Sequence, residues 1–130
     1  MSYPTDRAGP TIESSTNVFD VAVFQELVES LQTEAAVAVY RKFIENAAEF
    51  IGELPQQNMD ARVETFHTLK GSAAMMGANR MSELAAQLQA QGAAVQVETA
   101  TQLLKDELEQ FRAAVASKLL ERGVSLDTPQ

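Results

Sequence analysis

Apolar residues recur at intervals of three and four positions through the middle of this chain, from about residue 18 to residue 122. This spacing places them on one face of an α-helix, whereas a half-buried strand would show strict alternation. Pro55, Gly77 and Gly92 interrupt the pattern, and these two residue types commonly end helices. The spacing therefore predicts an all-α protein whose helices are joined by short connections.

The interruptions divide the pattern into five expected helices, at about 19–31, 33–54, 58–76, 80–91 and 97–121. Pro55 should end the second helix, because proline disfavours helix at the preceding residue. Asn58 is the expected cap of the third helix and Gly77 its terminator. Because short connections favour antiparallel neighbours, we expect an antiparallel up-down-up-down four-helix bundle with an extra short N-terminal helix across one end. The residues expected in its core are Val21, Phe24, Val28, Leu31, Tyr40, Phe43, Ile44, Ala47, Ile51, Leu54, Val63, Phe66, Leu69, Ala73, Met76, Met81, Leu84, Leu88, Leu104, Leu108, Phe111, Val115 and Leu119.

The chain is long enough to bury one hydrophobic core. Its 130 residues are 45% apolar, which suits a single domain. We assign this helical domain to residues 18–122. The segments 1–17 and 123–130 contain Pro, Ser, Thr and Gly without apolar periodicity, and we expect both to be flexible tails.

Charge and composition narrow the expected partners. A formal net charge of -8 disfavours nucleic acid and anionic lipid, which are bound by clustered Lys and Arg. The chain has no cysteine, which excludes disulfides and thiolate metal sites. No apolar run approaches the roughly 20 residues that span a bilayer, and the N-terminal segment does not resemble a signal peptide. We therefore expect a cytoplasmic protein that binds other proteins or small molecules.

The single histidine of the chain, His67, lies in the expected third helix but outside its apolar stripe. Lys70, Gly71, Ala74 and Ala78 follow on the same face of the helix. Glycine inside a helix costs roughly 1 kcal/mol relative to alanine, but its missing side chain lets another protein approach the imidazole. A neutral imidazole is a nucleophile, and a lysine can bind phosphoryl oxygens. The pattern indicates reversible phosphoryl transfer.

The segment from His67 to Gly77 resembles the signature of histidine-containing phosphotransfer (HPt) domains. In that signature the histidine is followed by an apolar position, Lys, Gly, two small residues and a later Gly, which this chain matches. The segment from Gly77 to Gln89 is similar to the second signature of the family, a leucine-containing heptad that ends in an acid or an amide. The resemblance implies an HPt helical bundle.

The resemblance also implies roles for individual residues. His67 would accept the phosphoryl group, Lys70 would interact with it, and Gly71 would leave room for an incoming receiver domain. Gln89, on the following helix, would hydrogen-bond or orient the histidine. Relatives carry an apolar docking patch beside the histidine, for which the candidates here are Ala74, Met75 and Ala78, together with parts of the first expected helix.

The implied partners are the receiver domain of a hybrid sensor kinase and the receiver domain of a response regulator. Their aspartates exchange the phosphoryl group, and the receiver supplies the Mg²⁺. We therefore expect this chain to bind no cofactor and no metal, and to act as a monomer. It lacks a Gly-rich phosphate loop, which agrees with a phosphocarrier rather than an enzyme.

Two other interpretations remain at this point. The segment from Glu64 to His67 has the Glu-x-x-His spacing of di-iron bundles, although those proteins need two such motifs and this chain has one histidine. Alternatively, the bundle binds receiver or kinase domains as an adaptor without carrying phosphate. Hydrolase chemistry of the serine or cysteine type is excluded, because no cysteine is present and no Ser, His and Asp arrangement surrounds the histidine.

Overall fold

Five α-helices make up the part of the chain that this computed structural model describes, residues 17–126. They are α1 (Val21–Leu31), α2 (Thr33–Glu53), α3 (Met59–Met75), α4 (Asn79–Gln91) and α5 (Val97–Leu120), with short 3₁₀ turns at Leu54–Gln56 and Gly92–Ala94. The predicted all-α class is confirmed, and each helix boundary lies within two residues of its expected position. The expected tails at 1–16 and 127–130 lie outside the described residues.

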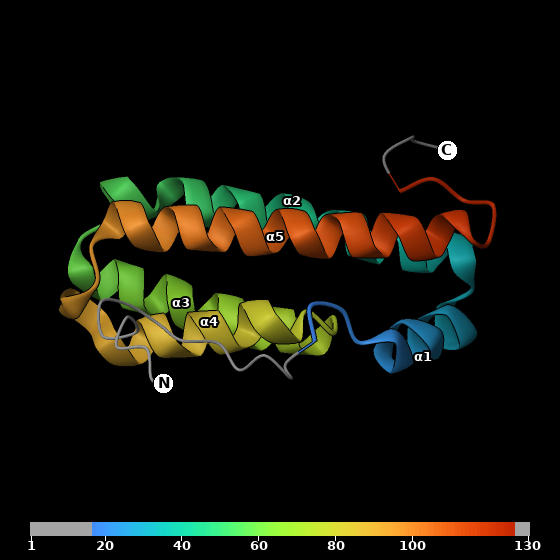
Figure 1. Cartoon of the computed structure of the whole chain (residues 1–130), viewed down its shortest axis with the longest axis horizontal. Coiled ribbons are helices and arrows are strands. Elements are labelled where there is room, and N and C mark those ends of the chain that lie inside the picture. Colours follow the sequence, from blue (N-terminus) through green and yellow to red (C-terminus); the bar gives the residue numbers. More distant parts are fainter. Residues whose placement is uncertain (1–16, 127–130) are drawn as a thin grey trace, which may run out of the picture.

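The helices form a bundle of two layers. Helices α2 and α5 lie side by side in one layer, and α3 and α4 lie side by side in the other (Figure 1). Contacts of α2 with α3 and of α4 with α5 join the layers, while the short α1 packs against α2 at one end. None of the described helices is both long and apolar enough to cross a membrane.

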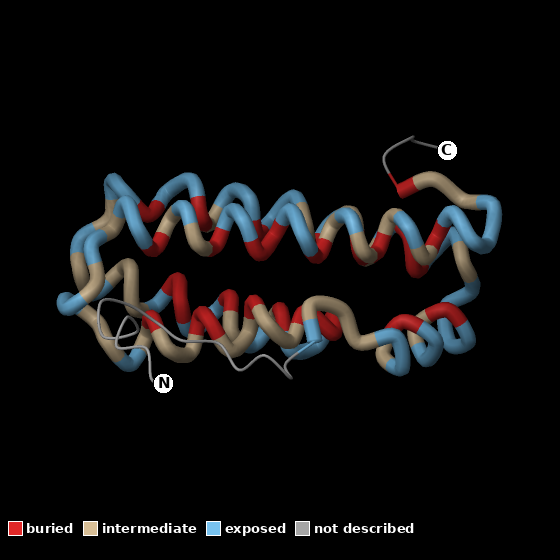
Figure 2. Tube along the Cα trace, viewed as in Figure 1, coloured by how far each residue is buried: buried red, intermediate tan, exposed pale blue. Residues whose placement is uncertain are grey.

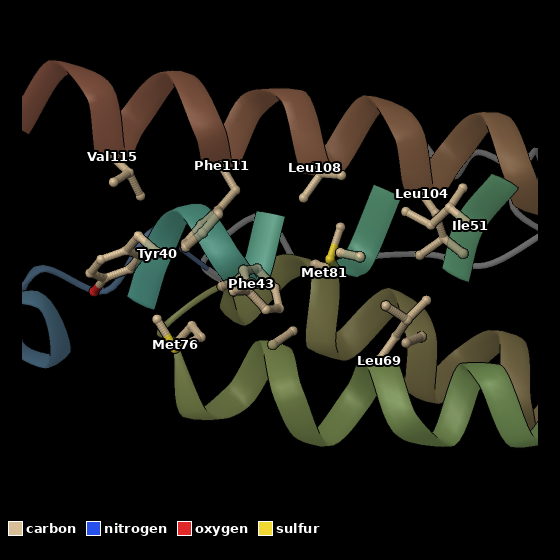
Figure 3. Packing of buried hydrophobic residues seen from close by; sticks show 14 of the residues in the cluster. Tyr40, Phe43, Ile51, Leu69, Met76, Met81, Leu104, Leu108, Phe111 and Val115 are labelled. Carbon is tan, nitrogen blue, oxygen red and sulfur yellow. The ribbon is translucent and has the colours of Figure 1, made fainter. Parts of the chain in front are cut away.

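The core fills the space between the two layers. Buried positions face inward on every long helix and exposed positions face outward (Figure 2). Side chains of α2 and α5 meet those of α3 and α4 across the bundle, for example Leu108 of α5 opposite Met81 of α4 (Figure 3). Burial of this apolar surface is the main source of stability, at about 25 cal/mol per Å².

A cluster of aromatic rings closes the core near α1. Its ring centroids lie between 5.6 and 6.3 Å apart, in edge-to-face and tilted arrangements. The rings come from three stretches of the chain, at residues 19–24, 40–43 and 111, so the cluster ties α1 to α2 and α5. Its members are Phe19, Phe24, Tyr40, Phe43 and Phe111.

Four residues of the expected core are less buried than predicted. Val21 and Leu31 are 36% and 38% exposed, because the short α1 presents only the face with Phe24 and Val28 to the bundle. Ile44 and Val63 are partly exposed. The helical period alone places a residue on a face, but the width of the buried part depends on neighbouring helices.

Local capping explains where the helices begin and end. The Asn58 side chain accepts a hydrogen bond of 2.8 Å from the Ala61 amide, which confirms Asn58 as the cap of α3. Gly77 follows α3 with a φ of 79°, as expected of a helix terminator. After α2, Arg62 donates hydrogen bonds to the carbonyls of Leu54 and Pro55, which fixes the turn into α3.

The prediction of a flexible tail from residue 123 is wrong for its first four residues. Gly123 has a φ of 77° and turns the chain back after α5, so that Leu126 becomes buried with 3% exposure. The Arg41 Nε and Nη2 atoms donate to the Leu126 carbonyl at 3.1 and 2.8 Å. This segment therefore belongs to the bundle, anchored on the outer face of α2.

We expect Gly77→Ala to lower the free energy of unfolding more than Gly123→Ala does. Both glycines have positive φ, so alanine incurs a backbone strain of about 1–2 kcal/mol at either site. At Gly77 the added methyl would also lie 3.1 Å from the Cβ atoms of Asp20 and Val23, whereas at Gly123 it meets no atom within 4 Å. Chemical denaturation should show a further loss of about 1 kcal/mol or more at Gly77. Equal losses of stability would show that the start of α1 moves to accommodate the added methyl group with no further loss of folding free energy.

Candidate functional site

His67 lies on the outward face of α3. The buried residues of this helix are Thr65, Phe66, Leu69 and Ala73, and His67 is exposed between two of them. The imidazole is therefore held in the middle of a rigid helix whose opposite face is anchored in the core. Such a residue can be reached by another protein without any rearrangement of this chain.

The imidazole contacts one side chain of the neighbouring helix. The Gln89 Nε2 atom, on α4, lies 3.4 Å from the His67 Nδ1 atom. This contact orients the ring so that Nδ1 faces α4, and the other ring nitrogen, Nε2, is the one that Gln89 does not engage. The implied partnership of Gln89 with the histidine is thus compatible with their geometry.

A hydroxyl of α4 also reaches the helix turn that follows His67. The Ser82 Oγ atom donates a hydrogen bond of 2.9 Å to the Lys70 carbonyl. Together with the Gln89 contact, this bond fixes α4 to the site at two points. Sequence reasoning did not identify Ser82, because nothing in the local pattern around a serine predicts a bond to another helix.

Lys70 and Gly71 border His67 on the next turn of α3. Lys70 is partly buried, and across residues 17–126 no carboxylate lies within ion-pair distance of its ammonium. Gly71 is exposed, and a Cβ added there would meet no atom within 4 Å. The space beside the imidazole is therefore open, with one cation at its edge, and Gly71 is not needed for close helix packing.

The expected docking patch is partly wrong. Ala74 is exposed and Met75 is 77% exposed, but Ala78 is fully buried. The prediction counted Ala78 along the face of a continuous helix. Helix α3 ends at Met75, and the positive φ of Gly77 turns the chain so that Ala78 points into the core at the start of α4.

Asp20 joins α1 to the turn between α3 and α4. Its amide donates to the Gly77 carbonyl at 2.8 Å, and its carboxylate accepts from the amides of Ala22 and, at 3.5 Å, the Asn79 side chain. The junction brings the start of α1, with the exposed Val21, to the end of the bundle that carries Met75. Sequence reasoning did not single out Asp20, although an acid directly before an apolar helix is a capping signal.

The electrostatic setting of the site is simple. Glu64 lies one turn before His67 and is exposed, and Lys70 lies one turn after it. Among the residues placed by the structure, no three His, Asp or Glu side chains are grouped so that they could hold a metal ion. The Glu-x-x-His spacing at Glu64 is therefore not accompanied by the further carboxylates that a di-iron site requires.

The arrangement suits nucleophilic transfer of a charged group. An exposed imidazole nitrogen provides a lone pair, an adjacent ammonium can pair with anionic oxygens, and a glycine leaves space for a second protein. Exposed apolar side chains at Ala74 and Met75 extend this surface along α3.

One comparison with known proteins gives a match. The family model described as "Hpt domain" matches residues 38–114, which is more than half of the chain and includes all of α3 and α4. The chain has no match among curated proteins or among solved structures.

We expect Gly71→Ala to raise the free energy of unfolding by about 1 kcal/mol, because alanine is the better helix former and its methyl group meets no neighbour. Gly52→Ala is the matched control, since Gly52 is an exposed glycine within α2 with equally open surroundings. Chemical denaturation of both variants measures the effect. A loss of stability confined to Gly71→Ala would mean that this glycine is required for packing.

Proposed function

Since this chain belongs to the Hpt domain family, we propose that it carries phosphoryl groups on His67 between two receiver domains of a phosphorelay. Hpt domains act in two-component signalling as phosphocarriers. The donor would be a receiver aspartate of a hybrid sensor kinase, and the acceptor a receiver aspartate of a response regulator. The observation that carries the proposal is the exposed His67, bordered by the open space at Gly71.

The chemistry assigned to His67 is a direct displacement. The Nε2 lone pair attacks the phosphorus atom of the receiver's aspartyl phosphate, an N–P bond forms, and the P–O bond to the aspartate breaks. The aspartate leaves as a carboxylate, and transfer onward reverses these bond changes. We assign the reacting nitrogen as Nε2 because Gln89 occupies the side of the ring that bears Nδ1.

Lys70 and Gly71 serve this transfer in different ways. The ammonium of Lys70, one turn after His67, supplies positive charge for the three oxygens of the phosphoryl group. The acidic pocket of a receiver, with its Mg²⁺, must come close to the imidazole, and Gly71 leaves the necessary room. This chain then needs no metal or cofactor of its own.

The docking surface follows from the exposed apolar residues beside the site. We place the receiver over Ala74 and Met75, with Val21 of α1 at the edge, and leave out the buried Ala78. Methionine adapts its shape readily to different partners, which suits a surface that two receivers must share. We further propose that the chain works as a monomer in the cytoplasm, and that its helices follow an antiparallel up-down-up-down order.

The proposal is tested by incubating the chain with Mg²⁺ and a panel of phosphorylated receiver domains, followed by intact-protein mass spectrometry at neutral to alkaline pH. We expect one acid-labile phosphoryl adduct, and none in His67→Gln. Because His67 is exposed, this variant should keep the helical circular dichroism and unfolding midpoint of the parent. Receiver binding without any adduct would instead favour the adaptor interpretation.

We expect Gly71→Gln to slow phosphoryl transfer by about tenfold or more, because a side chain beside the imidazole obstructs the receiver. An increase of about 1.4 kcal/mol in the activation free energy is enough for a tenfold slower rate. The same substitution at Gly52, an exposed glycine of α2 with open surroundings, should leave the rate unchanged. Single-turnover transfer from one phosphorylated receiver measures both rates. Equal rates in the two variants would contradict the role of Gly71.

A further inference from the structure

The contact between Gln89 and His67 joins an amide to the ring nitrogen that does not react. In the structure the amide nitrogen of Gln89 faces Nδ1 at 3.4 Å. A carboxamide carries a donor and an acceptor at the end of one side chain, and rotation of the amide by about 180° exchanges them. Gln89 can therefore match either protonation state of Nδ1 from the same position on α4.

The two states of the carrier require opposite hydrogen bonds at Nδ1. Before transfer, Nε2 needs a free lone pair, so the neutral ring carries its proton on Nδ1 and the Gln89 Oε1 atom can accept it. After transfer, Nε2 is bonded to phosphorus and the Nδ1 proton is released to solvent, which leaves a lone pair on Nδ1. The Gln89 amide can then donate to that lone pair from the same position on α4, within 3.4 Å of Nδ1.

We infer that Gln89 reverses its amide between these two states and thereby protects phosphohistidine at His67 from loss to water. This inference rests on the proposed function, since it concerns the same phosphoryl group. Gln89 touches the imidazole but not the reacting atoms, so it is a positioning residue.

The protection comes from the protonation state of the leaving group. When water attacks phosphorus, a new O–P bond forms and the N–P bond breaks, and the ring departs with the bonding electron pair. A ring that carries a proton on Nδ1 leaves as neutral imidazole, whereas a ring without it must leave as an imidazolate anion. A donor at Nδ1 opposes protonation there, while a carboxylate in the same place would favour it. Glutamine thus keeps the phosphorylated ring in its slower-reacting form.

The surroundings of the ring allow the effect of residue 89 to be isolated. The charged side chains one turn away on α3, Glu64 and Lys70, are unchanged by substitution on α4. Gln91, two residues after Gln89, lies about 200° around the helix from it, since successive residues are about 100° apart. Gln91→Glu therefore makes the same amide-to-carboxylate change on another face of α4 and is the matched control.

The lifetime of phosphohistidine can be measured without any receiver. Phosphoramidate transfers its phosphoryl group to imidazole nitrogen with release of ammonia, so it loads His67 directly, and intact-protein mass spectrometry then follows the decay at fixed pH. We expect Gln89→Glu to lose the group roughly three- to tenfold faster than the parent, the effect of about one hydrogen bond. Gln89→Ala should decay at an intermediate rate, and Gln91→Glu should match the parent.

A spectroscopic readout separates this role from a structural one. In ¹⁵N NMR of the unphosphorylated protein, Gln89→Glu should shift the ring towards the form with its proton on Nδ1, relative to Gln89→Ala, while Gln91→Glu should not. Equal decay rates in all four proteins, or identical ring signals in the two Gln89 variants, would overturn the inference. If phosphoramidate loads His67 but no receiver does, the proposed relay fails while the decay rates still decide the role of Gln89.

Discussion

Close packing of α3 against α4 is the contact on which the whole site depends. Both helices carry a small, fully buried residue, Ala73 on α3 and Ala85 on α4. Small side chains let packed helices approach closely. This approach brings the Gln89 amide to the imidazole and the Ser82 hydroxyl to the Lys70 carbonyl. Without it, His67 would be an isolated histidine on a solvated helix. The site is therefore a property of a helix pair, built on a core that fixes the distance between them.

The fold was largely predictable because its signals are local. The spacing of apolar residues reports the helical period, and Asn58, Pro55 and Gly77 act on the turns where they stand. Errors arose where burial depends on distant partners. Val21 has the helical spacing of a core residue, but no neighbouring helix covers it. Leu126 was assigned to a tail from its local sequence, whereas its burial depends on α2 and on the hydrogen bonds from Arg41.

The site was predictable to the extent that one helix determines it. The outward direction of His67 and its neighbours Lys70 and Gly71 follows from counting along α3. The same counting failed at Ala78, because it continued past the residue where the helix ends. The contact of Gln89 with His67 was expected only from the family resemblance, and the bonds of Ser82 and Asp20 were not expected at all. Each of these contacts joins two segments that are distant in sequence, so no local pattern predicts it.

The anchoring of Leu126 by Arg41 fixes the side from which the chain leaves the described bundle. Leu126 is bonded to Arg41 and shares a shallow pocket with Ile44 and Arg112, on the outer face of the layer formed by α2 and α5. His67 belongs to the other layer, so the width of the bundle separates the two. A fluorescent protein or a second folded module joined after this segment would therefore start from the layer that does not carry the imidazole.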